Sequence, residues 1–127
     1  MARVVFTGLE ETAAGQIGRA LTAQRHEIAH KQRDAVMRDL VDADIVFAGG
    51  DSAEYLPLLK QVRMARPALP FVVVTRLPEV VQWLDALEAG ATDYCAGPFE
   101  TQQVQWVMES AMLGRGNTRG FTETRVC

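Results

Sequence analysis

Short apolar segments alternate with amphipathic segments along most of the chain. Three of the apolar segments are nearly continuous stretches of β-branched or aromatic residues, which is typical of strands covered on both faces of a sheet. Five segments are predicted to be strands, at residues 4–6, 26–29, 45–48, 71–74 and 92–95.

The segments between these strands carry apolar residues three or four positions apart, a spacing that places one apolar stripe on a helix. Five helices are predicted, with the stripes Ala14, Ile17 and Leu21; Val36, Met37 and Leu40; Tyr55, Leu58, Leu59 and Val62; Val80, Leu84 and Leu87; and Val104, Val107, Met108 and Ala111. An alternation of five strands and five helices favours an α/β fold, with a parallel sheet covered by helices on both faces. Any functional site should then lie at the carboxyl ends of the strands.

Length and charge narrow the class of protein. The 127 residues fit one domain, predicted at 1–113, and the glycine-rich stretch that follows predicts a flexible tail or linker at 114–127. A formal net charge of -3 does not favour nucleic-acid binding, and no apolar run approaches the roughly 20 residues of a membrane span. Cys95 and Cys127 do not form a disulfide framework, and no signal peptide is recognised, so we expect a cytoplasmic domain with reduced thiols.

The second half of the chain carries a recognisable motif. Residues 87–94 read Leu-Glu-Ala-Gly-Ala-Thr-Asp-Tyr and are followed by Gly97-Pro98-Phe99, which resembles the receiver motif L-x-A-G-A-x-D-Y-L-x-K-P-F. Residues 56–63 and 67–75 resemble the third helix and the fourth strand of the same family. The chain is thus similar to the response-regulator receiver family (chemotaxis-regulator-like) over about residues 3–113. The resemblance implies a flavodoxin-like three-layer α/β/α sandwich, with five parallel strands in the order 2-1-3-4-5 and five helices.

The same resemblance implies where a receiver's chemistry would lie. An aspartate nucleophile follows the third strand, an acidic pair after the first strand holds Mg²⁺, and a lysine after the fifth strand pairs with the phosphoryl group. In this chain the aspartate aligns with Gly49, the acidic pair with Gly8 and Leu9, and the lysine with Gly97. Because glycine has no side chain to attack, coordinate or pair, the sequence predicts a pseudo-receiver that is not phosphorylated on aspartate.

Four other residues bear on this site. Glu10 and Asp51 are acidic residues near these positions and are candidates for weak metal binding, but the sequence favours plainer roles, a helix start for Glu10 and a turn or cap for Asp51. Thr75 and Tyr94 match the threonine and the aromatic residue that report phosphorylation in receivers. They could still act as a switch, or they could be structural residues at strand ends. One alternative function is therefore an active receiver with Asp51 as its acceptor.

A second alternative is a dinucleotide-binding module that uses Gly15 and Gly18. The strand at 4–6 and the glycines after it resemble the start of such a fold. The spacing is unsuitable, however, because seven positions separate Gly8 from Gly15, and Glu10 lies between them. His26 and His30 flank a predicted strand and lack further ligands, so we expect no zinc site.

Tryptophan placement predicts a partner surface. Trp106 lies opposite the apolar stripe of the fifth helix, and Trp83 lies at the edge of the fourth helix's stripe. Aromatic side chains are enriched at protein interfaces. Since receivers communicate through their fourth helix, fifth strand and fifth helix, we expect Trp83, Tyr94 and Trp106 to contact a signalling protein or a second copy. The predicted function is phosphorylation-independent signalling without enzymatic activity or a cofactor, with no role in nucleic-acid or membrane binding.

Overall fold

One parallel sheet organises the computed structural model, which describes residues 3–32, 35–36, 38, 42–50, 52–75, 80–96 and 101–113. Its strands are β1 (Arg3–Thr7), β2 (Glu27–His30), β3 (Ile45–Ala48), β4 (Phe71–Thr75) and β5 (Asp93–Ala96). Their order is β2-β1-β3-β4-β5, and every neighbouring pair is parallel. The predicted number of strands, their order and the flavodoxin-like arrangement are confirmed.

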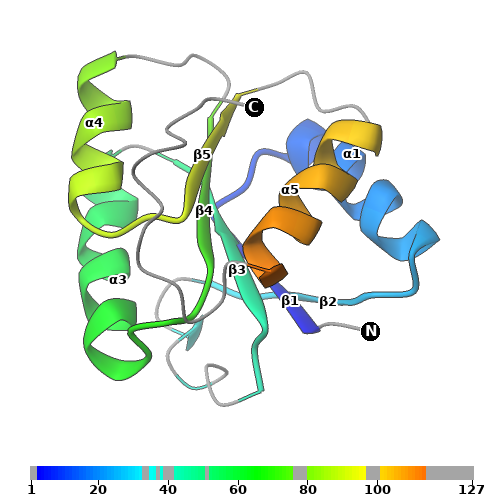
Figure 1. The fold of residues 1–127 in the computed structure, drawn as a ribbon, viewed down its shortest axis with the longest axis horizontal. Coiled ribbons are helices and arrows are strands. Elements are labelled where there is room, and N and C mark those ends of the chain that lie inside the picture. Colours follow the sequence, from blue (N-terminus) through cyan, green and yellow to red (C-terminus); the bar gives the residue numbers. More distant parts are fainter. Residues whose placement is uncertain are drawn as a thin grey trace.

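Four helices are described: α1 (Glu11–Ala23), α3 (Ser52–Ala65), α4 (Val80–Glu88) and α5 (Thr101–Leu113). Helices α1 and α5 cover one face of the sheet, and α3 and α4 cover the other (Figure 1). The predicted second helix falls mostly on residues outside the description, although Val36 within it is fully buried. The predicted tail at 114–127 also lies outside the described residues.

Alternate residues of each central strand pack on opposite faces, because successive strand side chains point to opposite sides. In β1, Val4 and Phe6 join the core beneath α1 and α5, whereas Val5 joins the core beneath α3. Strand β4 alternates in the same way, with Val72 on the first face and Val73 on the second. This two-sided burial explains why the strands read as continuous apolar runs in the sequence.

The predicted stripes of α3 and α5 are buried at every position whose side chain is described, and α1 buries Ile17 and Leu21 as predicted. The phase predicted for α4 is wrong. Leu84 is 47% exposed and Val81 is 70% exposed, whereas Ala86 is fully buried. Apolar residues surround this short helix on several sides, so their spacing alone does not select the buried face. Packing against the sheet selects the side that carries the small Ala86 instead.

The guanidinium of Arg63 joins three segments at the end of the sheet where α3 terminates. Its Nε donates to the carbonyl of Gly90 at 2.8 Å, and its Nη1 donates to the carbonyl of Leu69 at 2.6 Å. Its Nη2 lies 3.5 Å from Thr92 Oγ1, which in turn accepts the backbone N–H of Phe71. Burial lowers the pKa of Arg63. This one side chain therefore holds the turn that leads into β5.

No helix within the described ranges is both long enough and apolar enough to cross a membrane.

Candidate functional site

The carboxyl ends of β1 and β3 lie side by side at the position where the sequence predicts the site. Thr7 pairs with Ala48 in the sheet, and the backbone N–H of Gly49 donates to the Thr7 carbonyl at 2.9 Å. Gly49 is buried, whereas Gly8 is exposed and has φ of 66°. The positive φ turns the chain sharply after β1, a conformation that glycine adopts at no steric cost. The turn brings Gly8 and Leu9 directly over Gly49.

The space beside Gly49 is occupied by this turn. A Cβ atom at position 49 would lie 2.8 Å from the Gly8 carbonyl oxygen, 3.1 Å from Leu9 Cδ2 and 3.2 Å from Leu9 Cα. Two of these three atoms belong to the backbone, so a rotamer change cannot remove the contacts. The side chain of Leu9 packs against the core beneath α1. The structure thus brings together three of the positions predicted from the receiver resemblance, and it fills the space where an acceptor side chain would start.

The acidic residues considered for metal binding, Glu10 and Asp51, gain no support from the structure. Glu10 is exposed and precedes α1, and its side chain makes no cap hydrogen bond to the helix. Asp51 and Gly97 lie outside the described residues. Within the described ranges, no three histidine, cysteine or acidic side chains gather closely enough to hold a metal ion. His30 packs edge-on against Phe6, with ring centroids 5.3 Å apart.

The two switch-like residues lie on neighbouring strands. Thr75 ends β4 and is half-buried, and Tyr94 in β5 pairs with Val73. Tyr94 is only 1% exposed. The expectation that Tyr94 lies on a partner surface is therefore wrong for this conformation, because its side chain packs into the core beneath α3 and α4.

Tyr55 of α3 belongs to the same core cluster as Tyr94, and sequence reasoning identified it only as a stripe residue. Burial, with smaller effects of Tyr94 and Asp85, raises the pKa of Tyr55 to about 12. Its hydroxyl is buried without a hydrogen-bond partner among the described residues. The long-range meeting of the two tyrosines leaves no local signal in the sequence, since 39 positions separate them.

Large apolar side chains are exposed on both α4 and α5. Trp106 of α5 is 44% exposed, as predicted, and Val81 and Leu84 of α4 are exposed on the other side of the sheet. The backbone of Trp83 lies in α4, but its side chain is outside the description. Figure 1 shows β5 between the two helices.

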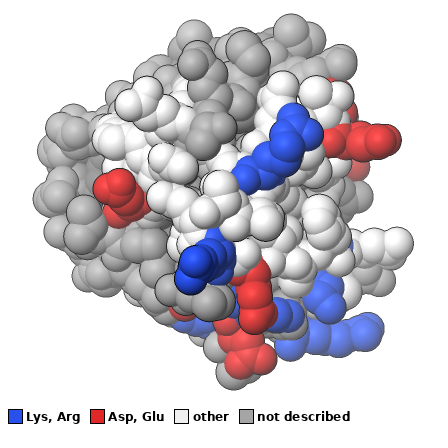
Figure 2. Space-filling view, turned by 90° about the vertical axis from the view of Figure 1, so that its right-hand side faces the viewer, with Lys and Arg blue, Asp and Glu red and all other residues white. Residues whose placement is uncertain are grey.

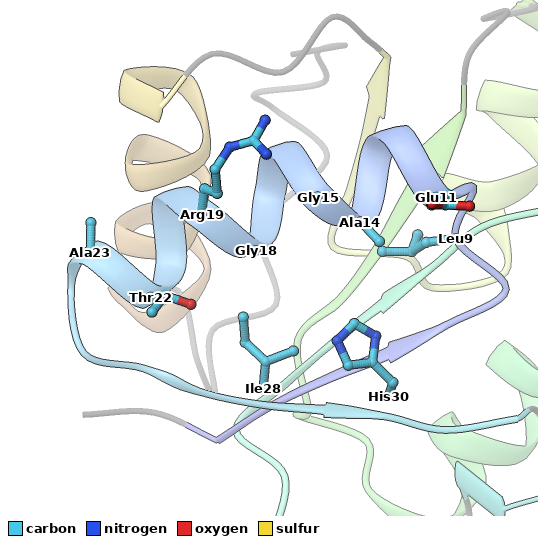
Figure 3. A pocket seen from close by; sticks show the side chains of 10 residues that line it. All are labelled: Leu9, Glu11, Ala14, Gly15, Gly18, Arg19, Thr22, Ala23, Ile28 and His30. Carbon is cyan, nitrogen blue, oxygen red and sulfur yellow. The ribbon is translucent and has the colours of Figure 1, made fainter.

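The glycines of the dinucleotide alternative do not form a phosphate-binding turn. Gly15 and Gly18 lie inside α1, which begins at Glu11, so their N–H groups belong to the helix interior. That alternative is wrong, because the fingerprint needs its glycines in the turn before the helix. Both glycines instead line an open groove of about 960 Å³ between α1 and β2 (Figure 3).

Comparison with known proteins agrees with this fold, although no protein-family model matches the chain. The chain is 31% identical over 93 residues to the transcriptional regulatory protein ZraR of Salmonella typhimurium, a match that covers 73% of this chain and 20% of that protein. It is 30% identical over 82 residues to the phosphate regulon regulatory protein PhoB of Klebsiella pneumoniae, covering 65% and 35% of the two chains. The matches thus cover only about a fifth to a third of these relatives.

Solved structures share the fold. The receiver domain of NtrX from Brucella abortus superposes with a TM-score of 0.76 at 21% identity, covering 87% of this chain and 98% of that one. These structures show that the chain has the fold of a response-regulator receiver domain, and the matches to bacterial regulators support that family for its sequence.

Proposed function

We propose that this chain is a receiver-like domain of a two-component-related pathway that signals through protein contacts and without phosphorylation of an aspartate. The observation that carries the proposal is the occupied space at Gly49. The acceptor position has no side chain, and a Cβ there would lie 2.8 Å from the Gly8 carbonyl oxygen.

Phosphoryl transfer needs a nucleophile aligned with phosphorus and a cation that neutralises the developing charge. Neither Gly8 nor Leu9 offers the carboxylate oxygens that Mg²⁺ prefers. The residues around Gly49 therefore do not fit the Mg²⁺ that receivers use. Glu10 is exposed, and within the described part of the chain no three histidine, cysteine or acidic side chains gather closely enough to hold a metal ion.

The surface that flanks β5 is the proposed site of protein contact. Trp106 of α5 and Val81 and Leu84 of α4, the helices on either side of β5 in Figure 1, present large apolar side chains to solvent. Aromatic residues in such positions supply much of the binding energy of protein interfaces. We include Trp83 in this proposed surface because it lies on the same helix as Leu84. The proposed partner is a cytoplasmic signalling protein.

Treatment with acetyl phosphate and Mg²⁺, followed by intact-mass measurement, tests the proposal. The unmodified mass should persist under conditions that phosphorylate an active receiver measured in parallel. Asp51→Ala is the matched variant, because Asp51 is the acidic residue nearest in sequence to position 49. A phosphoryl adduct that forms on the natural chain and disappears in Asp51→Ala would establish an active receiver with an unusual acceptor, and the proposal would fail.

A further inference from the structure

The outward face of α1 consists largely of small residues. The opposite face of the helix is buried and includes Ile17 and Leu21. Gly15 and Thr22 lie on the outward side, whereas Gly18 faces Ile28 and Phe6 at the floor of the groove that runs toward β2 (Figure 3). Gly15, which carries no side chain, is partly exposed on this face.

Neither glycine is required by the fold of a single chain. Only Gly8, Gly50 and Gly90 are described with positive φ, so Gly15 and Gly18 have ordinary helical backbones. A Cβ at position 15 would approach nothing closer than Arg19 Nη1 at 3.8 Å, and one at position 18 would meet Ile28 Cδ1 at 3.7 Å. Alanine would fit at both positions and would favour the helix. Position 18 faces its own sheet, but at Gly15 the missing side chain leaves room for another backbone to approach beside the Arg19 side chain.

Two opposite charges stand on either side of Gly15. Glu11, Gly15 and Arg19 are four residues apart, so they form one ridge along the helix. At a rise of about 1.5 Å per residue, each charge lies roughly 6 Å along the axis from Gly15. Neither Glu11 nor Arg19 forms an ion pair or a side-chain hydrogen bond within the described part of the chain. Arg19 points away from Ile28 and His30, at the rim of the groove (Figure 3).

The charges on this ridge of α1 are complementary to those of a second α1 that runs in the opposite direction. If two copies of α1 lie antiparallel about a two-fold axis at Gly15, Glu11 of each copy lies level with Arg19 of the other. A two-fold interface uses the same patch on both copies, so both ion pairs form together. Among the described residues, the charged side chains seen on this side of the molecule are of both signs and form no single-sign patch that would oppose a second copy (Figure 2).

We propose that the outward face of α1 is a self-association surface, on which two copies of this chain pack their α1 helices antiparallel across Gly15. The contact is small, because a helix of 13 residues is only about 20 Å long. Stable interfaces bury about 800 Å² per partner, so the structure points to a reversible, concentration-dependent dimer. The proposal is independent of the site at Gly49 and of the exposed Trp106.

Sedimentation velocity of the 127-residue chain over a wide concentration range tests the proposal. A reversible dimer should appear and should weaken at high salt, because salt screens exposed ion pairs. Glu11→Arg and Arg19→Glu should each weaken association by at least about tenfold, since each change turns both pairs repulsive. The double variant, which exchanges the two charges, should restore association to within about threefold of the natural chain.

Matched controls separate the surface from general effects of charge and folding. Lys60→Glu makes the same change in net charge as Arg19→Glu on an exposed position of α3, across the sheet, and should leave association unchanged. Gly15→Leu should raise the melting temperature, because leucine favours helix, and yet abolish the dimer by preventing close approach. A chain that stays monomeric at all concentrations would overturn the proposal. So would a dimer that tolerates both single charge reversals, or one that Trp106→Ala abolishes.

Discussion

Replacing Gly49 by alanine should destabilise the domain, and the structure indicates by how much. The added methyl group would lie 2.8 Å from the Gly8 carbonyl oxygen and 3.2 Å from Leu9 Cα. Contacts of 2.8 Å are shorter than van der Waals packing allows, so the turn after β1 must move. Leu9 resists that movement because its side chain packs against the core.

Overpacking of this kind costs about 1–3 kcal/mol. We therefore expect Gly49→Ala to lower the free energy of unfolding by about 2 kcal/mol. For a domain of this size, each kcal/mol corresponds to roughly 4 °C in melting temperature, so the midpoint should fall by roughly 8 °C. Gly18→Ala is the matched control, because its Cβ would meet its nearest neighbour at an ordinary 3.7 Å. That variant should gain about 0.5–1 kcal/mol from helix propensity.

Thermal and urea unfolding, monitored by circular dichroism, should show a loss of stability for Gly49→Ala and a gain for Gly18→Ala. If Gly49→Ala has the same melting temperature as the natural chain, the turn does not press on Gly49, and the claim that the space beside Gly49 is occupied is refuted. The same reasoning applies to Gly49→Asp, which should be destabilised and should still not accept a phosphoryl group from acetyl phosphate with Mg²⁺.

Four further predictions concern other parts of the domain. Millimolar Mg²⁺ should not raise the melting temperature beyond a control of matched ionic strength, because Gly8 and Leu9 supply no carboxylates to bind it. A ligand at a hundredfold excess over its Kd would add about 2.7 kcal/mol to the free energy of unfolding, and a rise of that size would contradict the prediction. Trp106→Ala should change the free energy of unfolding by less than about 0.5 kcal/mol and weaken capture of a partner protein, whereas Val107→Ala should cost about 1 kcal/mol or more through lost burial; equal destabilisation would place the indole in the core. Arg63→Lys should cost about 2 kcal/mol in urea unfolding, because lysine lacks the fork that reaches Gly90 and Leu69 together; an unchanged midpoint would contradict the role of this side chain. Folding raises the pKa of Tyr55 from 10.0 to about 12. The stability that depends on a neutral Tyr55 is therefore fully present below pH 10 and is lost as the pH rises toward 12. Tyr55→Phe should reduce this alkaline loss of stability in melting curves taken across the range.

The spacing of apolar residues predicted the buried face of a helix well where only one face of that helix is apolar. The stripe that ends at Val62 in α3 and the pair Val107 and Met108 in α5 are buried as expected, and Trp106 is exposed opposite that pair. In α4 the apolar residues lie on several sides, and the predicted burial of Leu84 was wrong. Hydrophobic spacing reports a helix's buried face only when a single face is apolar.

By itself, the sequence determined the alternation of strands and helices, the parallel sheet and the absence of a side chain at Gly49, because each is a local property of composition or spacing. Only the tertiary structure decided that the turn at Gly8 presses on Gly49, that Tyr94 packs inward, and that Arg63 holds the turn before β5. These contacts join residues tens of positions apart. They depend on strand order, on register and on the way side chains fill the space between layers, and none of these leaves a periodic trace along the chain.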